Sequence, residues 1–114
     1  MALTLYGIPN CDTVKKARLY LERRKKPHQF HDFKKEGVDA AALERWAKIV
    51  GMQTLINTRG TTWRNLDEAD RIALTDTKAR ALMLAHPSLI KRPVLEGPDL
   101  LLVGFSSPQW DSLL

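Results

Sequence analysis

The sequence is poor in cysteine and has no long hydrophobic run. Cys11 is the only cysteine among 114 residues, so an internal disulfide is excluded, whereas small secreted domains usually carry several bridged pairs. We therefore expect a free thiol in a cytoplasmic protein. No apolar stretch approaches the roughly 18 residues that a membrane-spanning helix needs, and the N-terminus lacks the pattern of an export signal. We expect no association with membranes.

Aromatic residues are also scarce, at 7% of the chain. Trp46, Trp63 and Trp110 lie far apart in the sequence, so we expect them to pack against other side chains rather than to stack on bases. The histidines share no short metal-binding spacing with Cys11, and the chain has no Gly-rich phosphate-binding loop. We assign no metal and no bound cofactor, and we expect no direct binding of nucleic acid.

Acidic residues are outnumbered by basic ones. Eighteen Lys and Arg against 13 Asp and Glu give a formal charge of +5, which favours encounters with anionic partners in general. The densest basic run, residues 23–26, stands at the end of a predicted helix, where cations interact favourably with the helix dipole. We interpret this run, and Lys34–Lys35, as solvated structural features. Length and an apolar fraction of 44% predict one globular domain, 1–114.

Hydrophobic periodicity predicts a strand, a helix and a second strand in the first third of the chain. Residues 3–6 are apolar and β-favouring, and they end at a turn-prone Gly-Ile-Pro-Asn segment. Apolar residues then recur at helical intervals from a start at or just after Cys11 until Pro27. Residues 28–33 predict a strand parallel to the first, since a helix connects the two.

Residues 34–37 predict a turn, and Asp39 is a candidate N-cap for a helix that ends near Gly51. Residues 51–65 have the composition of a loop with little regular structure. The rest of the chain predicts short helices at 67–73 and 76–85, a β-hairpin with strands at 94–95 and 100–103 around a turn at 96–99, and a final helix through Leu113. This order, β-α-β, a helical insert at about 38–86, then β-β-α, predicts an α/β thioredoxin-like fold with a mixed four-stranded sheet.

Cys11 is the first candidate for chemistry, because it lies where a strand exits into a helix. Backbone N–H groups and the dipole at a helix N-terminus favour negative charge and so lower the pKa of a cysteine. Asp12 opposes this effect by placing a negative charge beside the sulfur. We interpret Cys11 as an exposed, reactive thiol, because a cysteine in a Pro-Asn-Cys-Asp loop is poorly placed to point into the core.

Three cations are candidate partners for such a thiol. Lys91 and Arg92 precede Pro93 at the start of a predicted strand, and either cation could stabilise a thiolate or bind an anionic substrate. Arg59 lies in a loop that suits contact with an anion. A plain strand entry at Pro93 and an ordinary solvent-exposed arginine at position 59 are the alternative interpretations.

Several short motifs, in this order, are similar to those of the arsenate reductase-like family, which includes Spx-type regulators and YffB-type proteins. The resemblance spans nearly the whole chain and is closest to the YffB-type members. It is carried by Leu3-Thr4-Leu5-Tyr6-Gly7, Pro9-Asn10-Cys11, Lys15-Lys16-Ala17-Arg18, Gly51 with Ile56-Asn57-Thr58-Arg59, His86-Pro87, Leu89-Ile90-Lys91-Arg92-Pro93-Val94 and Val103-Gly104-Phe105.

The resemblance implies a thioredoxin fold with an inserted helical subdomain, a catalytic Cys11 and an Arg92 beside it. It also implies a cis peptide bond before Pro93. For YffB-type members the implied activity is glutathione-dependent thiol reduction, with an oxidised thiol as the second substrate. We therefore expect Cys11 and Arg92 to be catalytic in a monomeric protein. The predicted substrate-binding residues are Asn10, Arg59, Lys91 and Pro93.

Two departures from the family pattern bear on alternative functions. Arsenate reductases of this type use a further arginine in the final hairpin region, but residues 100–105 contain none, which makes arsenate reduction the least favoured function. Many Spx-type regulators carry a Cys-x-x-Cys switch, whereas Val14 stands three residues after Cys11. A regulator that binds the RNA polymerase α subunit remains the alternative, because Gly51 matches a glycine linked to that contact.

Overall fold

The computed structural model describes residues 3–114, which form two compact units. The sheet unit comprises the described chain up to Gly37 together with Arg92–Leu114, and the helical unit comprises Val38–Lys91. One domain with a helical insert at about 38–86 stays a prediction. Within residues 3–114, no helix combines the length and the apolar character needed to cross a bilayer.

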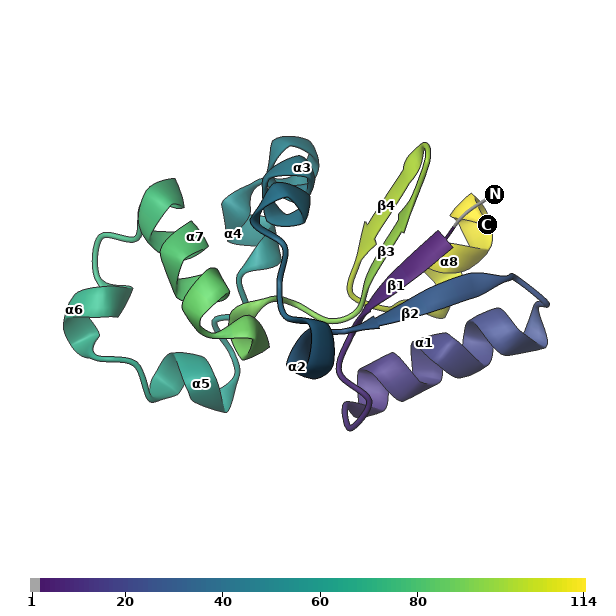
Figure 1. The fold of residues 1–114 in the computed structure, drawn as a ribbon, viewed down its shortest axis with the longest axis horizontal. Helices are drawn as coiled ribbons and strands as arrows, with labels where there is room; N and C mark the ends of the chain where they lie inside the picture. Colours follow the sequence, from purple (N-terminus) through teal and green to yellow (C-terminus); the bar gives the residue numbers. More distant parts are fainter. Residues whose placement is uncertain (1–2) are drawn as a thin grey trace. The chain divides into compact units, whose positions relative to one another are not determined.

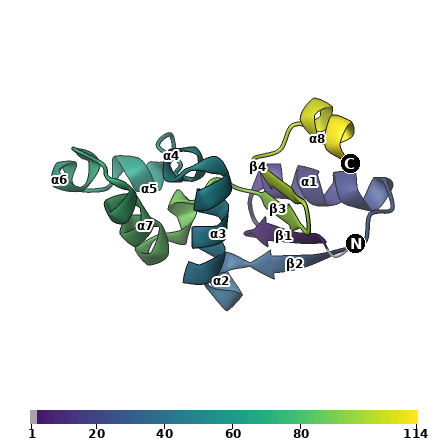
Figure 2. The same cartoon turned by 90° about the horizontal axis from the view of Figure 1, so that it is seen from above.

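The sheet unit contains a mixed four-stranded sheet, which confirms the predicted fold class. Its strands are β1 (Leu3–Gly7), β2 (His28–Asp32), β3 (Val94–Gly97) and β4 (Leu100–Val103). They lie in the order β2-β1-β3-β4, as Figures 1 and 2 show. β1 pairs in parallel with β2, while β3 is antiparallel to both β1 and β4.

Two helices cover one face of this sheet: α1 (Asp12–Arg23) and α8 (Ser107–Leu113). Side chains in β1 alternate between buried and half-buried positions, as expected for a strand with one face in the core. α1 buries residues at helical spacing. The resulting core consists of Leu3, Leu5, Ala17, Leu21, Leu95, Leu102 and Trp110. The sheet unit therefore consists of two layers, with the helices in one and the sheet in the other.

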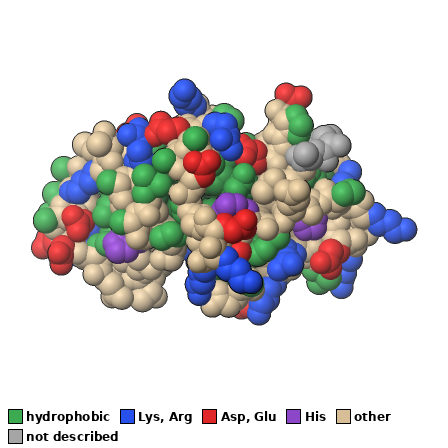
Figure 3. All heavy atoms as spheres, viewed as in Figure 1, with side chains coloured by type: hydrophobic (Ala, Val, Ile, Leu, Met, Phe, Trp, Pro, Cys, Tyr) green, Lys and Arg blue, Asp and Glu red, His purple; other side chains and the backbone are tan. Residues whose placement is uncertain are grey.

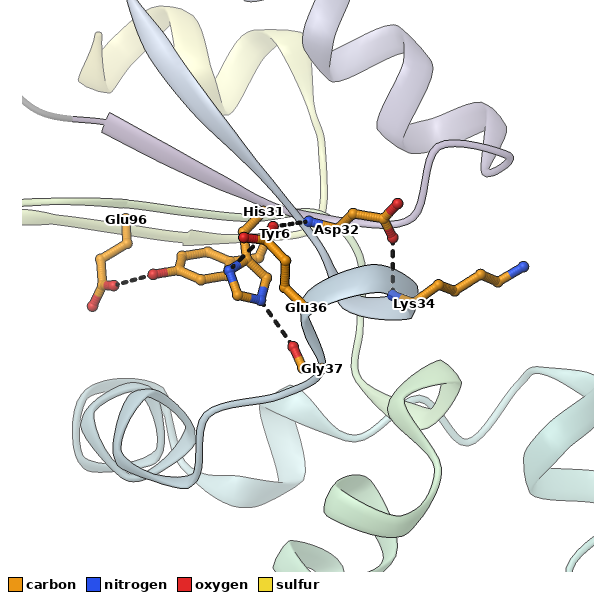
Figure 4. A network of polar contacts seen from close by, with 7 residues as sticks. All are labelled: Tyr6, His31, Asp32, Lys34, Glu36, Gly37 and Glu96. Carbon is orange, nitrogen blue, oxygen red and sulfur yellow. Dashed lines mark hydrogen bonds and ion pairs between the residues drawn. The ribbon is translucent and has the colours of Figure 1, made fainter.

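β2 ends one residue earlier than predicted, and the predicted turn at 34–37 is mostly a short helix, α2 (Phe33–Glu36). The Asp32 carboxylate caps α2 by accepting a hydrogen bond from Lys34 N–H at 2.9 Å. Figure 4 shows Glu36 turned back toward β2, where its Oε2 accepts from Asp32 N–H at 3.1 Å. His31 Nε2 lies 2.8 Å from the carbonyl oxygen of Gly37 and therefore donates to it. These contacts fold the chain onto itself at the end of the sheet unit.

The hairpin turn is also tighter than predicted. β3 extends through Gly97, so only Pro98 and Asp99 remain in the turn between β3 and β4. α1 ends at Arg23, before the predicted stop at Pro27. Arg24 already leaves helical geometry there, with φ −90° and ψ 4°.

The helical unit contains more regular structure than its composition predicts. Its helices are α3 (Ala40–Val50), α4 (Met52–Leu55), α5 (Thr61–Arg64), α6 (Glu68–Arg71), α7 (Asp76–Ala85) and the 3₁₀ helix η1 (Pro87–Leu89). The prediction of a loop over 51–65 was wrong, since α4 and α5 lie in this segment. The predicted helix at 67–73 is shortened to α6, while α3 and α7 agree with prediction.

Two backbone hydrogen bonds organise the segment that was predicted as a loop. Asn57 N–H donates to the Leu89 carbonyl at 2.6 Å, and Lys91 N–H donates to the Leu55 carbonyl at 2.7 Å. They flank an isolated antiparallel bridge between Ile56 and Ile90. The segment is thus held by pairing with a distant part of the helical unit rather than by a periodic sequence of its own.

Candidate functional site

Cys11 is the N-cap residue of α1, which confirms the predicted helix start. Its backbone is extended, with φ −103° and ψ 124°, and its carbonyl already accepts the first helical hydrogen bond from Lys15 N–H at 2.9 Å. The free thiol is half-buried. It stands at the end of the loop that leaves β1 after Gly7. A half-buried side chain at this place is open to a reaction partner while still in contact with protein donors.

The close approach of α1 to the end of β1 depends on Gly7. A Cβ atom at this position would lie 2.7 Å from Val14 Cγ2, closer than packed carbon atoms approach, and 3.2 Å from Val14 Cγ1, which is also tight. Val14 is in the first turn of α1 and is fully buried. The glycine therefore lets Val14 pack against the end of the strand, and this contact positions the N-terminus of α1, where Cys11 is the N-cap residue.

Three groups of the sheet unit favour the thiolate form of Cys11. Burial raises the pKa of the Cys11 thiol, but hydrogen bonds from Val14 N–H, the Arg92 side chain and Thr13 N–H lower it, as does the positive charge of Arg92. The net result is a pKa below the ordinary value. Asp12, whose negative charge we expected to oppose this effect, does not reverse it. Cys11 therefore has the electrostatic setting of an activated cysteine.

Sheet register explains why Arg92 reaches Cys11 although 80 residues separate them in the sequence. Tyr6 in β1 lies opposite Val94 in β3, so the residues just before Val94 run beside the loop that follows Gly7. The Arg92–Pro93 peptide bond is cis, as the family resemblance implied. Pro93 is buried, and its carbonyl accepts a hydrogen bond from Gly104 N–H at 2.8 Å.

The other predicted site residues are placed as follows. Asn10 is exposed in the loop next to Cys11 in the sheet unit. Arg59 and Lys91 belong to the helical unit and are exposed. The Arg59 backbone is held by its N–H, which donates to Asn57 Oδ1 at 3.1 Å. The structure thus brings Arg92 to Cys11, whereas binding roles for Asn10, Arg59, Lys91 and Pro93 stay predictions.

Sequence reasoning missed three contributors to the site. Thr13 and Val14 act through backbone N–H groups, which any residue at these positions could supply except proline. The signal for them was available, since the second and third residues of a helix donate to its N-cap side chain. Gly7 contributes by a tertiary contact that no local pattern reveals. Within the described range 3–114, no group of three or more His, Cys, Asp or Glu side chains is placed to bind a metal ion.

Comparison with known proteins identifies relatives over nearly the full chain. A protein of Haemophilus influenzae, named only as uncharacterized, is 39% identical over 110 residues, and the alignment covers 96% of each of the two chains. The global transcriptional regulator Spx of Enterococcus faecalis is 27% identical, with 94% of this chain and 82% of Spx covered.

Solved structures give the same result. The structure of the YffB protein matches with a TM-score of 0.93 at 49% identity, over 96% of both chains. An arsenate reductase-related protein of Brucella melitensis matches with a TM-score of 0.79 at 50% identity, over 98% of this chain and 93% of its own. The model of the ArsC family matches residues 6–113. The chain therefore belongs to the ArsC family.

Proposed function

We propose that this protein is a glutathione-dependent thiol–disulfide reductase that uses Cys11 as its single nucleophile. The observation that carries this proposal is the lowered pKa of a half-buried Cys11 beside the guanidinium of Arg92. A thiolate is the attacking species in thiol–disulfide exchange. A low pKa therefore increases the fraction of protein that is ready to react at neutral pH.

The reaction proceeds in two exchanges. The Cys11 thiolate attacks the glutathione sulfur of a mixed disulfide between glutathione and a substrate thiol. The substrate thiolate leaves and takes up a proton, and Cys11 becomes bonded to glutathione. A second glutathione, as its thiolate, attacks the glutathione sulfur of this adduct, which releases oxidised glutathione and restores Cys11. External glutathione must resolve the adduct, because the chain has no second cysteine.

Arg92 supports both exchanges in this mechanism. Its hydrogen bond and positive charge stabilise the Cys11 thiolate before attack and again when Cys11 is the leaving group. Asn10 and Pro93, the sequence neighbours of Cys11 and Arg92, are proposed to contact the glutathione backbone. Arg59 and Lys91 are proposed to bind its carboxylates, a role that suits exposed cations.

Intact-mass measurement after exposure to oxidised glutathione tests the proposal. The wild-type chain should gain one glutathione and lose it when reduced glutathione is added, whereas Cys11→Ser should gain none. Arg92→Met should form the adduct more slowly at neutral pH, and Lys48→Met, an exposed charge change in α3, should react like wild type. Failure of wild type to form the adduct, or to release it to glutathione, would exclude this mechanism.

A regulator that binds RNA polymerase is the second candidate. It is favoured by the Spx relatives, which cover 94% of this chain, and by Gly51, which has φ +86° and open space where a side chain would stand. We propose the C-terminal domain of the polymerase α subunit as the partner. Pull-down of that domain, retained by Cys11→Ser and lost in Gly51→Arg, would support regulation. Absence of any pull-down by wild type would reject it. Arsenate reduction is less favoured, because β4 and the residues up to Phe105 contain no arginine.

A further inference from the structure

A shallow groove of about 400 Å³ runs along α1 in the sheet unit, away from the residues assigned to thiol chemistry. Lys16, Leu19, Tyr20 and Arg23 of α1 line it, together with Arg24, which follows the helix, and Phe105. Neither Cys11 nor Arg92 lines it, so its use does not depend on the proposed reductase activity.

The floor of the groove is apolar and rigid. Tyr20, Phe105 and Trp110 meet edge to face, with ring centroids 4.8 to 5.5 Å apart. Trp110 is fully buried, which fixes the other two rings from below. Leu19 adds an aliphatic side chain that is 45% exposed. An exposed leucine beside an ordered aromatic cluster offers an anchor point for an apolar side chain of a partner.

The rim of the groove is cationic, but its cations differ in their partners. Arg24 pairs with Asp111 at 2.6 Å and lies over the Tyr20 ring at 4.4 Å, so its charge is already engaged. Lys16 and Arg23 are exposed, and no carboxylate within residues 3–114 lies in ion-pair contact with either. Figure 3 shows Lys and Arg side chains (blue) at the lower edge of the view, with Asp and Glu side chains (red) among them.

The spacing of these groups follows one helix face. Lys16, Leu19, Tyr20 and Arg23 occupy positions i, i+3, i+4 and i+7, so the two free cations stand about 10 Å apart along the axis of α1, with the apolar side chains between them. A second helix with carboxylates at i and i+7 and apolar residues at i+3 and i+4 presents the complementary pattern. Phosphate backbones are a poorer match, because they offer no apolar side chain to Leu19 and Phe105.

We propose that this groove binds an acidic amphipathic helix of a partner protein, which sets its apolar residues on Leu19, Tyr20 and Phe105 and its carboxylates against Lys16 and Arg23. Helix-in-groove recognition of this kind draws affinity from the apolar anchors and orientation from the charges. The net charge of +5 adds long-range attraction for such a segment.

Fluorescence anisotropy with the full chain and a labelled model helix tests the proposal. The probe carries glutamate at i and i+7 and leucine at i+3 and i+4; matched probes carry lysine for glutamate or serine for leucine. The acidic leucine probe should bind, and both matched probes should bind at least about tenfold more weakly. The variant Lys16→Glu/Arg23→Glu should weaken binding about tenfold or more, because it replaces two attractions by repulsions. Leu19→Ser should weaken it about threefold.

Lys48→Glu on α3 of the helical unit serves as the charge control and should bind the acidic leucine probe like wild type. Circular dichroism checks that every variant is folded. Equal binding by wild type and by Lys16→Glu/Arg23→Glu would overturn the proposal, as would equal binding of the leucine and serine probes. Tighter binding of duplex DNA or of anionic phosphatidylserine vesicles than of the acidic probe would assign the surface to another class of partner. Cys11→Ser should bind the probe normally, which separates this test from that of the reductase.

Discussion

Replacing Gly7 by alanine would place a methyl group inside the van der Waals contact of Val14. The new Cβ would stand 2.7 Å from Val14 Cγ2, and Val14 is fully buried, so its side chain has no open space to move into. Overpacking of this kind typically costs 1–3 kcal/mol. Replacing glycine also lowers the conformational entropy of the unfolded chain, which offsets about 0.4–1 kcal/mol of this destabilisation. The expected net loss in the free energy of unfolding is therefore about 1–2 kcal/mol, measured by urea denaturation.

A double-mutant cycle isolates this contact from other effects of the methyl group. Val14→Ala alone should cost about 2 kcal/mol, from two buried methyl groups and the cavity that they leave. In Gly7→Ala/Val14→Ala the added methyl group has space, so the double variant should be about 1–2 kcal/mol more stable than the sum of the single losses predicts. Losses that add to within about 0.5 kcal/mol would refute the steric reasoning.

The Gly7→Ala substitution should also change the pKa of the Cys11 thiol. Val14 N–H is the strongest of the groups that lower the pKa of Cys11, so displacement of the first turn of α1 should raise that pKa in Gly7→Ala. The pH dependence of the alkylation rate reports it. Leu43→Val, a cavity-forming change in the core of the helical unit, should reduce stability without moving the thiol pKa. A raised pKa in both variants would show a general effect of lost stability instead.

Other predictions concern single interactions. Arg92→Met should raise the pKa of Cys11, because it removes a hydrogen bond and a positive charge; an unchanged pH profile of alkylation would contradict this. Because the folded pKa of Cys11 lies below its ordinary value, the thiolate stabilises the fold at pH values above that ordinary pKa, and this contribution is lost as the pH falls through the folded pKa. The stability of wild type relative to Cys11→Ser should therefore rise with pH across that window and then level off, as urea titrations at several pH values would show. Burial and a hydrogen bond to Asp111 raise the pKa of Tyr20, so Asp111→Asn should lower it in an ultraviolet titration. Asp39 caps α3 by accepting a hydrogen bond from a backbone N–H at 3.1 Å, and Asp39→Ala should reduce the free energy of unfolding by about 1 kcal/mol; a change below about 0.3 kcal/mol would show that the cap contributes little.

Elements with a clear period and clear boundaries could be predicted from the sequence. α3 combines a capping Asp39, apolar residues at helical spacing and Gly51 as its stop, so each signal points to the same helix. α4 and α5 could not be predicted, because a helix of four residues is too short to show a period. Long-range contacts hold both: the Ile56–Ile90 bridge follows α4, and Thr62 of α5 shares a hydrogen bond with Ser88. Contacts of this kind leave no local signature.

The candidate site also has one part that local sequence predicts and one part that it does not. The position of Cys11 at the N-terminus of a helix could be predicted from the local transition from strand to helix. The contact between Cys11 and Arg92 came from the family resemblance, because the residues alone gave Arg92 no preference over Lys91 or Arg59. The physical reason is the pairing of β1 with β3, a register that depends on the whole sheet rather than on either segment.

Every group found to shift the pKa of Cys11 belongs to the sheet unit. Substitutions at the N-terminus of α1 or at Arg92 should therefore change the pKa of Cys11. Substitutions at Arg59 or Lys91, in the helical unit, should leave this pKa unaltered. In the proposed mechanism these two cations contact only the carboxylates of glutathione, so they should influence its binding. The pKa of Cys11 and the glutathione concentration needed for half-maximal rate thus measure separate properties, and a variant that changes one without the other assigns a residue to activation or to binding.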